Sequence, residues 1–222
     1  MMKLIYRVLL YMLGLWILAV GVAFSVNSRL GVSPANSLPY ALSTVSDISM
    51  GTWATIVFCS YILIQALLLR RAFKPVNVLQ IVFSTIFGYF VDLARWTLGD
   101  FSIPTYAGQL TMLAISILLV GLGLVFYLSV ELVPMPMEGM AIAIQKKLPR
   151  FQFYQTKIFV DCMGVLAAIV VSLAGSGVVA GVREGTVISA VLIGKVMGML
   201  MKPLDPIIRR ICFDEVESHS TS

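Results

Sequence analysis

Charge is scarce in this chain: of its 222 residues, 59% are hydrophobic and only 12% are charged, with a formal net charge of +5. Soluble domains carry about 25% charged residues, so the polar side chains are too few to cover a water-facing surface. The basic residues lie at the ends of apolar runs, which argues against nucleic-acid binding and favours contact with a lipid bilayer.

Six apolar runs approach the roughly 20 residues that a helix needs to cross a bilayer. They cover residues 5–28, 51–70, 77–96, 108–130, 153–173 and 185–203. Inside lipid, backbone groups must pair within their own segment, so all six should be α-helices. No small-x-small cleavage site follows the first run, and we expect a span there, not a removed signal. The predicted fold is an all-α polytopic membrane protein.

Short segments after the first and fourth spans interrupt this pattern. The helix-breaking residues in them are Gly31, Pro34, Pro134, Pro136 and Gly139. Proline at the first helical position favours a helix start, and Ser33 before Pro34 is suited to cap one. We therefore expect short helices from Pro34 to about Ser46 and from Pro136 to about Lys147. Whether they enter the membrane or lie on its surface stays open.

The two interrupted segments occupy the same register of an apparent internal duplication. Pro34 and Pro136 are 102 positions apart, as are Gly21 and Gly123. The duplication divides the chain into a three-helix repeat over 1–106, a second over 107–208, and a polar tail over 209–222 that we expect to be disordered. Because three is odd, the second repeat enters the membrane from the opposite side. Such inverted repeats are common in transporters.

Small residues recur every four positions in the third span of each half. They are Ser84, Gly88, Ala190, Gly194 and Gly198. This spacing places them on one helix face and allows close helix contact. We expect them to pack the two repeats together.

Basic residues predict the orientation of the spans. The side that holds the N-terminus receives twelve: Lys3, Arg7, Arg70, Arg71, Lys74, Lys146, Lys147, Arg150, Lys157, Lys202, Arg209 and Arg210. The other side receives three: Arg29, Arg95 and Arg183. We expect the first side, with both termini, to be the cytoplasm.

The run Leu30-Gly31-Val32-Ser33-Pro34, followed by Leu38, resembles the first-loop motif L-G-V-S-P-W-D-x-L of the YczE/YyaS/YitT family of bacterial integral membrane proteins. Ala35 and Asn36 replace the aromatic and the acid of that motif, so a role of the acid does not carry over. The resemblance implies a bacterial inner-membrane protein of similar length and span number, with transport as a hypothesis. It implies no particular substrate.

Five residues are candidates for binding a substrate: Ser33, Asn36, Glu138, Asp161 and Lys195. Asn36 and Glu138 each follow a helix-starting proline by two positions, where unpaired N–H groups could hold an anion. The alternatives are a local loop bond for Asn36 and a favourably placed first-turn acid for Glu138.

Ionisable groups inside apolar spans are costly and suggest function. Asp161 lies in the fifth span and could pair with Lys157 one turn earlier, an arrangement that could also be purely structural. Lys195 lies near the centre of the sixth span and needs a partner from another helix, for which Glu138 and Asp161 are candidates. Glu138, Asp161 and Lys195 could together form a proton-linked site.

The best functional hypothesis is a secondary transporter or exporter of a small solute, with proton coupling and a homodimer as further hypotheses. The alternatives are a substrate-binding membrane subunit of a larger transporter, with one pocket near the outer face, and a non-transporting scaffold with every charge paired. We expect no enzyme activity, cofactor or metal. The only histidine is His219 in the tail, and Cys59, Cys162 and Cys212 have no metal-binding spacing.

Overall fold

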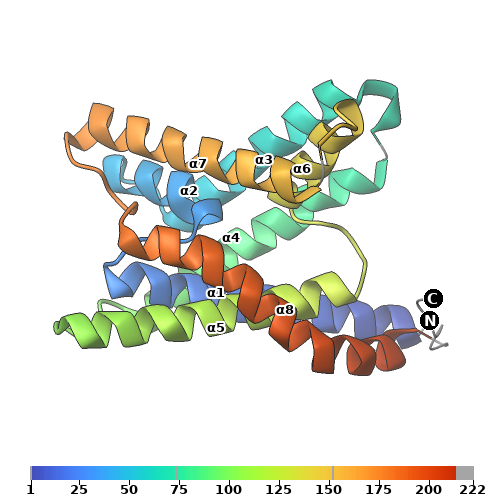
Figure 1. Ribbon diagram of the computed structural model, residues 1–222, viewed down its shortest axis with the longest axis horizontal. Helices are drawn as coiled ribbons and strands as arrows, with labels where there is room; N and C mark the ends of the chain where they lie inside the picture. Colours follow the sequence, from blue (N-terminus) through green and yellow to red (C-terminus); the bar gives the residue numbers. More distant parts are fainter. Residues whose placement is uncertain (1, 74, 152, 214–222) are drawn as a thin grey trace.

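The computed structural model describes residues 2–73, 75–151 and 153–213, and within them the chain forms α-helices and no strand (Figure 1). The long helices are α1 (Met2–Ser28), α3 (Met50–Leu69), α4 (Leu79–Leu98), α5 (Tyr106–Ser129), α7 (Phe153–Ser176) and α8 (Glu184–Cys212). The short ones are α2 (Pro34–Val45) and α6 (Pro136–Lys147), with 3-10 turns at Arg70–Ala72 and Pro75–Val78. The predicted all-α membrane fold is confirmed.

All six long helices are long and apolar enough to cross a membrane. They agree with the predicted spans to within three residues, except at the end of α8, which was expected near residue 203. Pro203 and Pro206 lie inside this helix, and Arg209 bonds back to Asp205 at 2.8 Å. Residues 209–212, expected in the tail, are therefore helical. Phe213 follows the helix, and residues 214–222 of the predicted tail lie outside the described residues.

The short helices α2 and α6 begin at Pro34 and Pro136, as predicted. Both begin near the middle of the molecule's length and run back towards the end from which the chain arrived (Figure 1). Ser33 precedes α2, but its side chain makes no bond to the helix backbone and accepts one from Asn36 Nδ2 at 3.0 Å.

The turns that lead into α2 and α6 share an unusual backbone. Arg29 and Glu131, 102 positions apart, have φ of 58° and 48°. This left-handed region costs a non-glycine residue about 1–2 kcal/mol and is uncommon. The same local geometry at the same register agrees with a duplication, while the inverted repeat as a whole stays a prediction.

Helices α1 and α5 pack closely against each other. A Cβ atom added at Gly14 would lie 2.9 Å from the carbonyl oxygen of Gly123. A Cβ atom added at Gly123 would lie 2.7 Å from the carbonyl oxygen of Gly14. The two glycines thus allow close backbone contact. Each short helix packs on a long helix of the other half of the chain. α2 of the first half packs on α7, and α6 of the second half packs on α3.

The small residues of the third spans do not pack the halves together. Gly88 of α4 lies against Gly51 of α3, within the first half. The same α3–α4 contact is held by Asp92, which accepts from Gly51 N at 2.8 Å and from Ser49 Oγ at 2.6 Å. Gly194 and Gly198 of α8 have open space where a Cβ would stand. The expected packing between repeats is therefore wrong for these residues.

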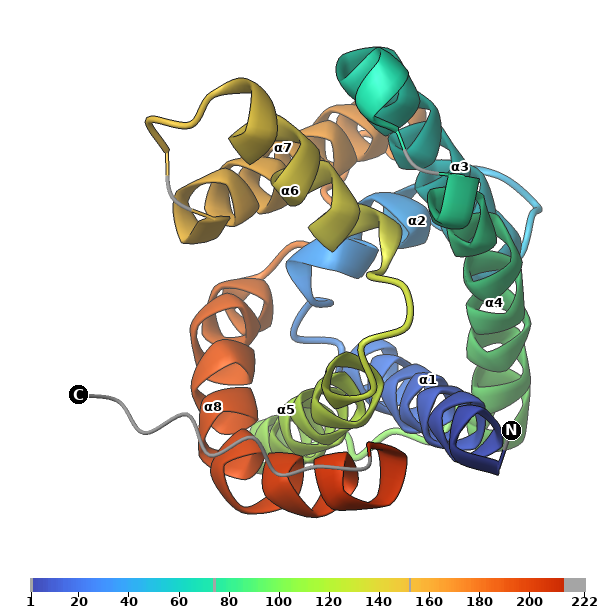
Figure 2. The ribbon, with the colours of Figure 1, turned by 90° about the vertical axis from the view of Figure 1, so that its right-hand side faces the viewer.

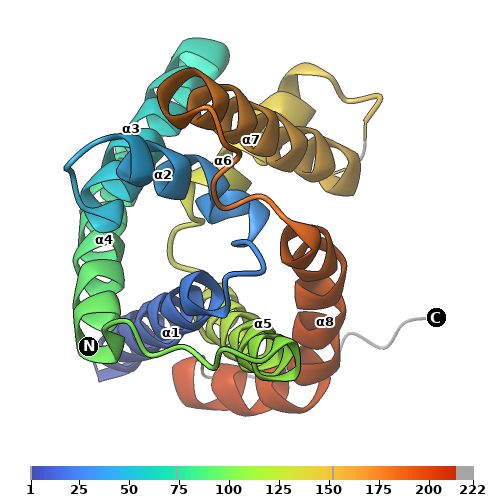
Figure 3. The ribbon, with the colours of Figure 1, turned by 90° about the vertical axis from the view of Figure 1, so that its left-hand side faces the viewer.

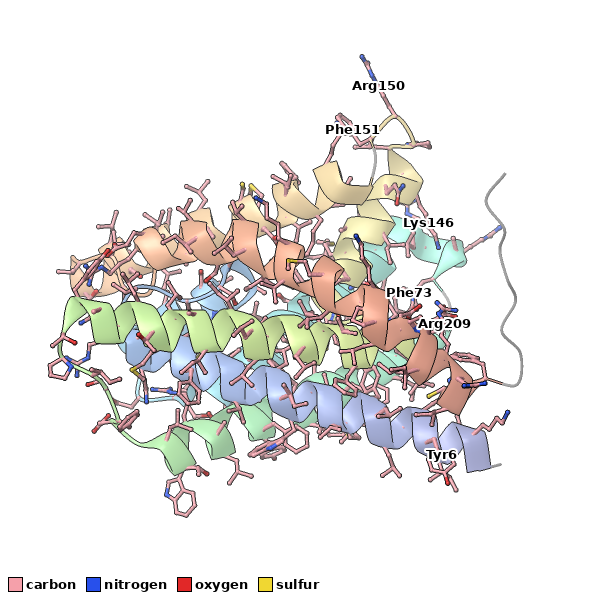
Figure 4. The ribbon with its side chains drawn as sticks, turned by 60° about the horizontal axis from the view of Figure 1, so that its bottom comes forward. Tyr6, Phe73, Lys146, Arg150, Phe151 and Arg209 are labelled. Carbon is pink, nitrogen blue, oxygen red and sulfur yellow. The ribbon has the colours of Figure 1, made fainter. Side chains whose placement is uncertain are left out.

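Basic side chains gather at one end of the helical bundle. Lys146, Arg150 and Arg209 lie at the end that also holds Tyr6 near the start of the chain (Figure 4). This is the end predicted to face the cytoplasm, although the orientation itself stays a prediction.

Candidate functional site

Three charged side chains of the second half meet where α6 crosses α7. Lys157 Nζ lies 2.6 Å from Asp161 Oδ1 and 3.8 Å from Glu138 Oε1. The Lys157–Asp161 pair follows from their spacing of four on one helix and confirms the predicted contact. The three side chains are 18–26% exposed, so they are largely but not fully enclosed. We call Glu138, Lys157 and Asp161 the charged cluster.

Glu138 lies in the first turn of α6, where an acid suits the partial positive charge of the helix end. Its Oε1 approaches Lys157, while its Oε2 is buried without a hydrogen-bond partner among the described residues. The phenol of Tyr127, from α5, faces this carboxylate, and its buried hydroxyl also lacks a described bond of good geometry. A hydroxyl donor and a carboxylate acceptor thus lie close enough to bond to each other.

The start of α6 is held by polar groups that the sequence analysis did not single out. Gln65 Nε2, from α3, donates to the Pro136 carbonyl oxygen at 2.9 Å and approaches Gln80 Oε1 at 3.3 Å. Both glutamines are 1% exposed. Their position inside apolar spans was a signal that could have found them, because buried amides in lipid need partners.

Gly139 lies inside α6 and does not break it, contrary to prediction. A Cβ there would lie 2.6 Å from Gln65 Oε1, so the glycine allows α3 to approach. Pro134 lies in the preceding loop, and Gly31 takes a left-handed φ of 107° in the other loop. In the same loop as Pro134, the Val133 carbonyl oxygen accepts from Tyr11 Oη at 3.0 Å.

In the first half, Asn36 occupies the position equivalent to Glu138. It is 4% exposed, and its Oδ1 is buried without a described partner. The starts of α2 and α6 both reach Gly164 of α7: a Cβ there would lie 3.7 Å from the Pro34 carbonyl oxygen and 3.6 Å from Met137 Cε. The first turns of both short helices therefore lie near Gly164 of α7.

Lys195 does not join the acids. It is exposed on α8, and no ion pair links it to Glu138 or Asp161 in the part of the chain that the structure describes. The reason is the position of α8, which lies along α5 and stands apart from α7 (Figures 2 and 3). The structure thus corrects the predicted Glu138–Asp161–Lys195 group to the charged cluster, with Lys157 as the cation.

A separate cavity of about 120 Å³ lies at the opposite end of the molecule from the basic end. Arg29, Tyr40 and Arg183 line it, together with Val26, Gly31, Val32 and Gly181. Arg183 Nη1 donates to the Arg29 carbonyl oxygen at 3.0 Å, which joins the α7–α8 loop to the α1–α2 loop.

Over the described residues, no group of three or more His, Cys, Asp or Glu side chains is placed to hold a metal ion. The charged cluster contains two acids and one lysine, and it could exchange protons or bind a small polar solute.

A family model described as a family of unknown function, DUF6198, matches residues 5–202. The chain is 25% identical over 201 residues to the uncharacterized protein YyaS of Bacillus subtilis, a match that covers 90% of this chain and 92% of that protein. It is 28% identical over 146 residues to the uncharacterized membrane protein YczE of the same organism, with 65% and 66% covered. No solved structure matches.

Proposed function

Because this chain belongs to the DUF6198 family, whose function is unknown, we propose a function from its own geometry: a secondary transporter or exporter of a small solute, coupled to protonation of the charged cluster. The relatives YyaS and YczE confirm the resemblance that the Leu30–Pro34 motif indicated, and with the six apolar helices they identify a membrane protein.

The observation that carries the proposal is the pair of short helices. α2 and α6 begin near the middle of the molecule's length, and their first turns lie near Gly164 of α7. Short helices whose N-terminal ends point at a midplane site are the device by which many transporters bind substrate. The polar groups of this chain that lack described partners include Asn36 Oδ1 at the start of α2 and Glu138 Oε2 at the start of α6.

The charge of the cluster supports proton coupling. With all three groups ionised, Glu138 and Asp161 outnumber Lys157, and the cluster carries one net negative charge. A net charge at membrane depth is costly. One bound proton makes the cluster neutral while Lys157 keeps one carboxylate as its partner. Proton binding and solute binding at Glu138 would then be linked.

Two observations favour the substrate-binding subunit as the second candidate. The cavity beside Arg29 and Arg183 lies near the face predicted to be outer, and α8 leaves Gly194 and Gly198 uncovered. The scaffold hypothesis required Glu138, Asp161 and Lys195 all to be paired. Glu138 and Asp161 are both paired with Lys157, but Lys195 has no described partner, which disfavours this hypothesis.

The first test is the thermal stability of the purified protein against a metabolite library, for wild type, Glu138→Gln and the control Glu131→Gln. A ligand at 100 times its Kd adds about 2.7 kcal/mol, which corresponds to about 5–10 °C in Tm for a chain of this size. Glu131 is a matched control because it pairs with Arg209 at the surface.

We expect a compound that stabilises wild type and Glu131→Gln but not Glu138→Gln. A compound that stabilises all three proteins equally would place the binding site elsewhere, and the cavity near Arg29 would become the first place to look. If no compound acts and only Glu138→Gln loses stability, the charged cluster is structural and the transport proposal fails.

A further inference from the structure

We propose that the cavity between the α1–α2 and α7–α8 loops binds a small oxyanion, a carboxylate or a phosphate group, through Arg29 and Arg183. Both arginines line this cavity, which has a volume of about 120 Å³. The inference does not rest on the proposed transport, because neither arginine belongs to the charged cluster. It assigns a second binding site, at the end of the molecule predicted to be outer.

The cavity has an excess of positive charge. Arg29 and Arg183 line it, and no acid does so among the described residues. Arg183 pairs with its neighbour Glu184, whose Oε1 lies 3.4 Å from Arg183 Nη2. The two side chains of this pair are 55% and 42% exposed, so water screens much of their attraction. Two positive charges and one negative charge leave the group with one net positive charge even when Glu184 is counted.

The equivalent turn in the second half shows which partner Arg29 lacks. Arg29 and Glu131 are 102 positions apart and share the left-handed backbone. Glu131 pairs with Arg209, so opposite charges meet at its turn. Arg29 takes part in none of the ion pairs of the described residues. An anion in the cavity would give Arg29 the partner that Glu131 has in Arg209.

The two guanidinium groups have donors available for such an anion. A guanidinium carries five N–H groups in a planar fork that matches a carboxylate or a phosphate. Arg183 uses Nη1 for the Arg29 carbonyl oxygen, at 3.0 Å, and Nη2 for Glu184. The side chain of Arg29 forms no hydrogen bond among the described residues. Binding an oxyanion therefore need not break the bond that joins the two loops.

The volume of the cavity limits the size of the ligand. A water molecule occupies roughly 30 Å³ in the liquid, so 120 Å³ is the space of about four water molecules. Sites for drug-sized ligands have volumes of about 300–1,000 Å³. The cavity therefore fits a single carboxylate or phosphate group, either as a small dissolved anion or as the headgroup of a lipid.

The walls of the cavity are formed without a ligand. Val32 N donates to the Gly181 carbonyl oxygen at 2.8 Å, and Gly185 N donates to the Leu30 carbonyl oxygen at 2.7 Å. Gly181 has a left-handed φ of 73°, and a Cβ atom added there would collide with the ring of Tyr40. Because the loops are already bonded to each other, an anion would bind without having to order them first.

The test is thermal unfolding of the full chain, purified in an uncharged maltoside detergent, with phosphate or acetate replacing chloride at constant ionic strength. Arg29→Gln removes one charge from the cavity and no described bond. Arg95→Gln is the matched control, because Arg95 is also predicted to be outer but does not line the cavity. Val26→Phe keeps both arginines and fills the space, because Val26 lines the cavity.

We expect the Tm of wild type to rise with the logarithm of the anion concentration once this exceeds the Kd. Arg29→Gln and Val26→Phe should need at least about ten times more anion for the same rise, because a hydrogen bond to a charged group contributes a factor of about ten or more. Arg95→Gln should respond like wild type. Glu138→Gln should do so too, which separates this site from the charged cluster.

An equal rise in Tm for all variants would overturn the site, because exclusion of phosphate from protein surfaces stabilises every variant alike. Native mass spectrometry of wild type and Arg29→Gln identifies the source of the anion. A phospholipid that wild type retains, that Arg29→Gln loses and that inorganic phosphate displaces would make the ligand a lipid headgroup. Equal lipid retention with a rise in Tm only when the cavity is intact would make it a dissolved anion.

No rise in wild type together with equal lipid retention in both proteins would also overturn the site. The outcome does not depend on the transport proposal. If the anion binds and no library compound depends on Glu138, the oxyanion site stands and the transport proposal fails. If a compound depends on Glu138 and the anion has no effect on wild type or its lipids, only the oxyanion site fails.

Discussion

Lys157 and Lys195 both interrupt apolar helices, and the structure gives them opposite surroundings. Lys157 has two carboxylates within 4 Å, one from its own helix and one from α6. Lys195 is exposed, with no described partner. A position inside an apolar helix therefore does not by itself decide which lysine belongs to the charged cluster. What decides is the helix face, because α7 presents Lys157 to α6 whereas α8 presents Lys195 away from the acids.

Replacing Lys157 with methionine should destabilise the protein by about 2 kcal/mol, less than the roughly 3–5 kcal/mol of a fully buried pair, because two acids lose their shared cation. Unfolding by SDS in mixed micelles at pH 7 measures the change. The additional replacement Glu138→Gln should restore part of the loss. Lys195→Met is the matched control and should stay within about 0.5 kcal/mol of wild type. Equal losses for both lysines would contradict a paired role for Lys157.

Among the elements, prolines act in two different ways in this chain. Pro34 and Pro136 start α2 and α6, where a missing N–H costs nothing. Pro203 and Pro206 lie inside α8 and interrupt its backbone bonding without ending it. A proline rule alone would end α8 near residue 203, but the burial of Ile208 and Cys212 and the bond from Arg209 to Asp205 stabilise its last turns.

The same replacement at two equivalent glycines should have opposite effects. Gly88→Ala should cost about 1–3 kcal/mol, because the new methyl group would collide with the backbone of α3 at Gly51. Gly194→Ala should stabilise by up to about 1 kcal/mol, because alanine favours helix and the space is open. SDS unfolding of both variants, beside wild type, measures the difference. A loss of similar size at Gly194 would mean that this face is covered in the membrane.

On the scale of the whole molecule, the two ends of the helical bundle differ in charge and in how their loops are bonded to each other. Lys146, Arg150 and Arg209 lie at one end (Figure 4), and the opposite end is closed by bonds between the α1–α2 and α7–α8 loops. Positive charge on the cytoplasmic side is the general rule. We infer that the basic end faces the cytoplasm and that the end with the bonded α1–α2 and α7–α8 loops faces outward.

Labelling in intact cells tests this orientation. In a chain with its three cysteines replaced by serine, Val178→Cys in the α7–α8 loop should react with a membrane-impermeant maleimide. Arg150→Cys should react only after the cells are made permeable. Both positions are exposed, so access to the reagent and not burial determines the result. The reverse pattern would invert the proposed orientation.

The sequence by itself determined the six spans, the two short helices and the Lys157–Asp161 pair, because each follows from a local rule. An apolar run of sufficient length must be helical in lipid, a proline marks a helix start, and a spacing of four places two side chains on one face. It also placed Glu138 at the start of α6, two residues after Pro136.

Only the tertiary structure decided which of these pieces meet. That Gln65 holds α6, that Tyr127 faces Glu138 and that Lys195 lies outside the charged cluster all depend on which helices pack together. Equivalent glycines at 88 and 194 have the same local sequence signal, yet one is in close contact and the other is uncovered. Packing between distant segments is set by the combined shape of many side chains, and no short stretch of sequence contains that information.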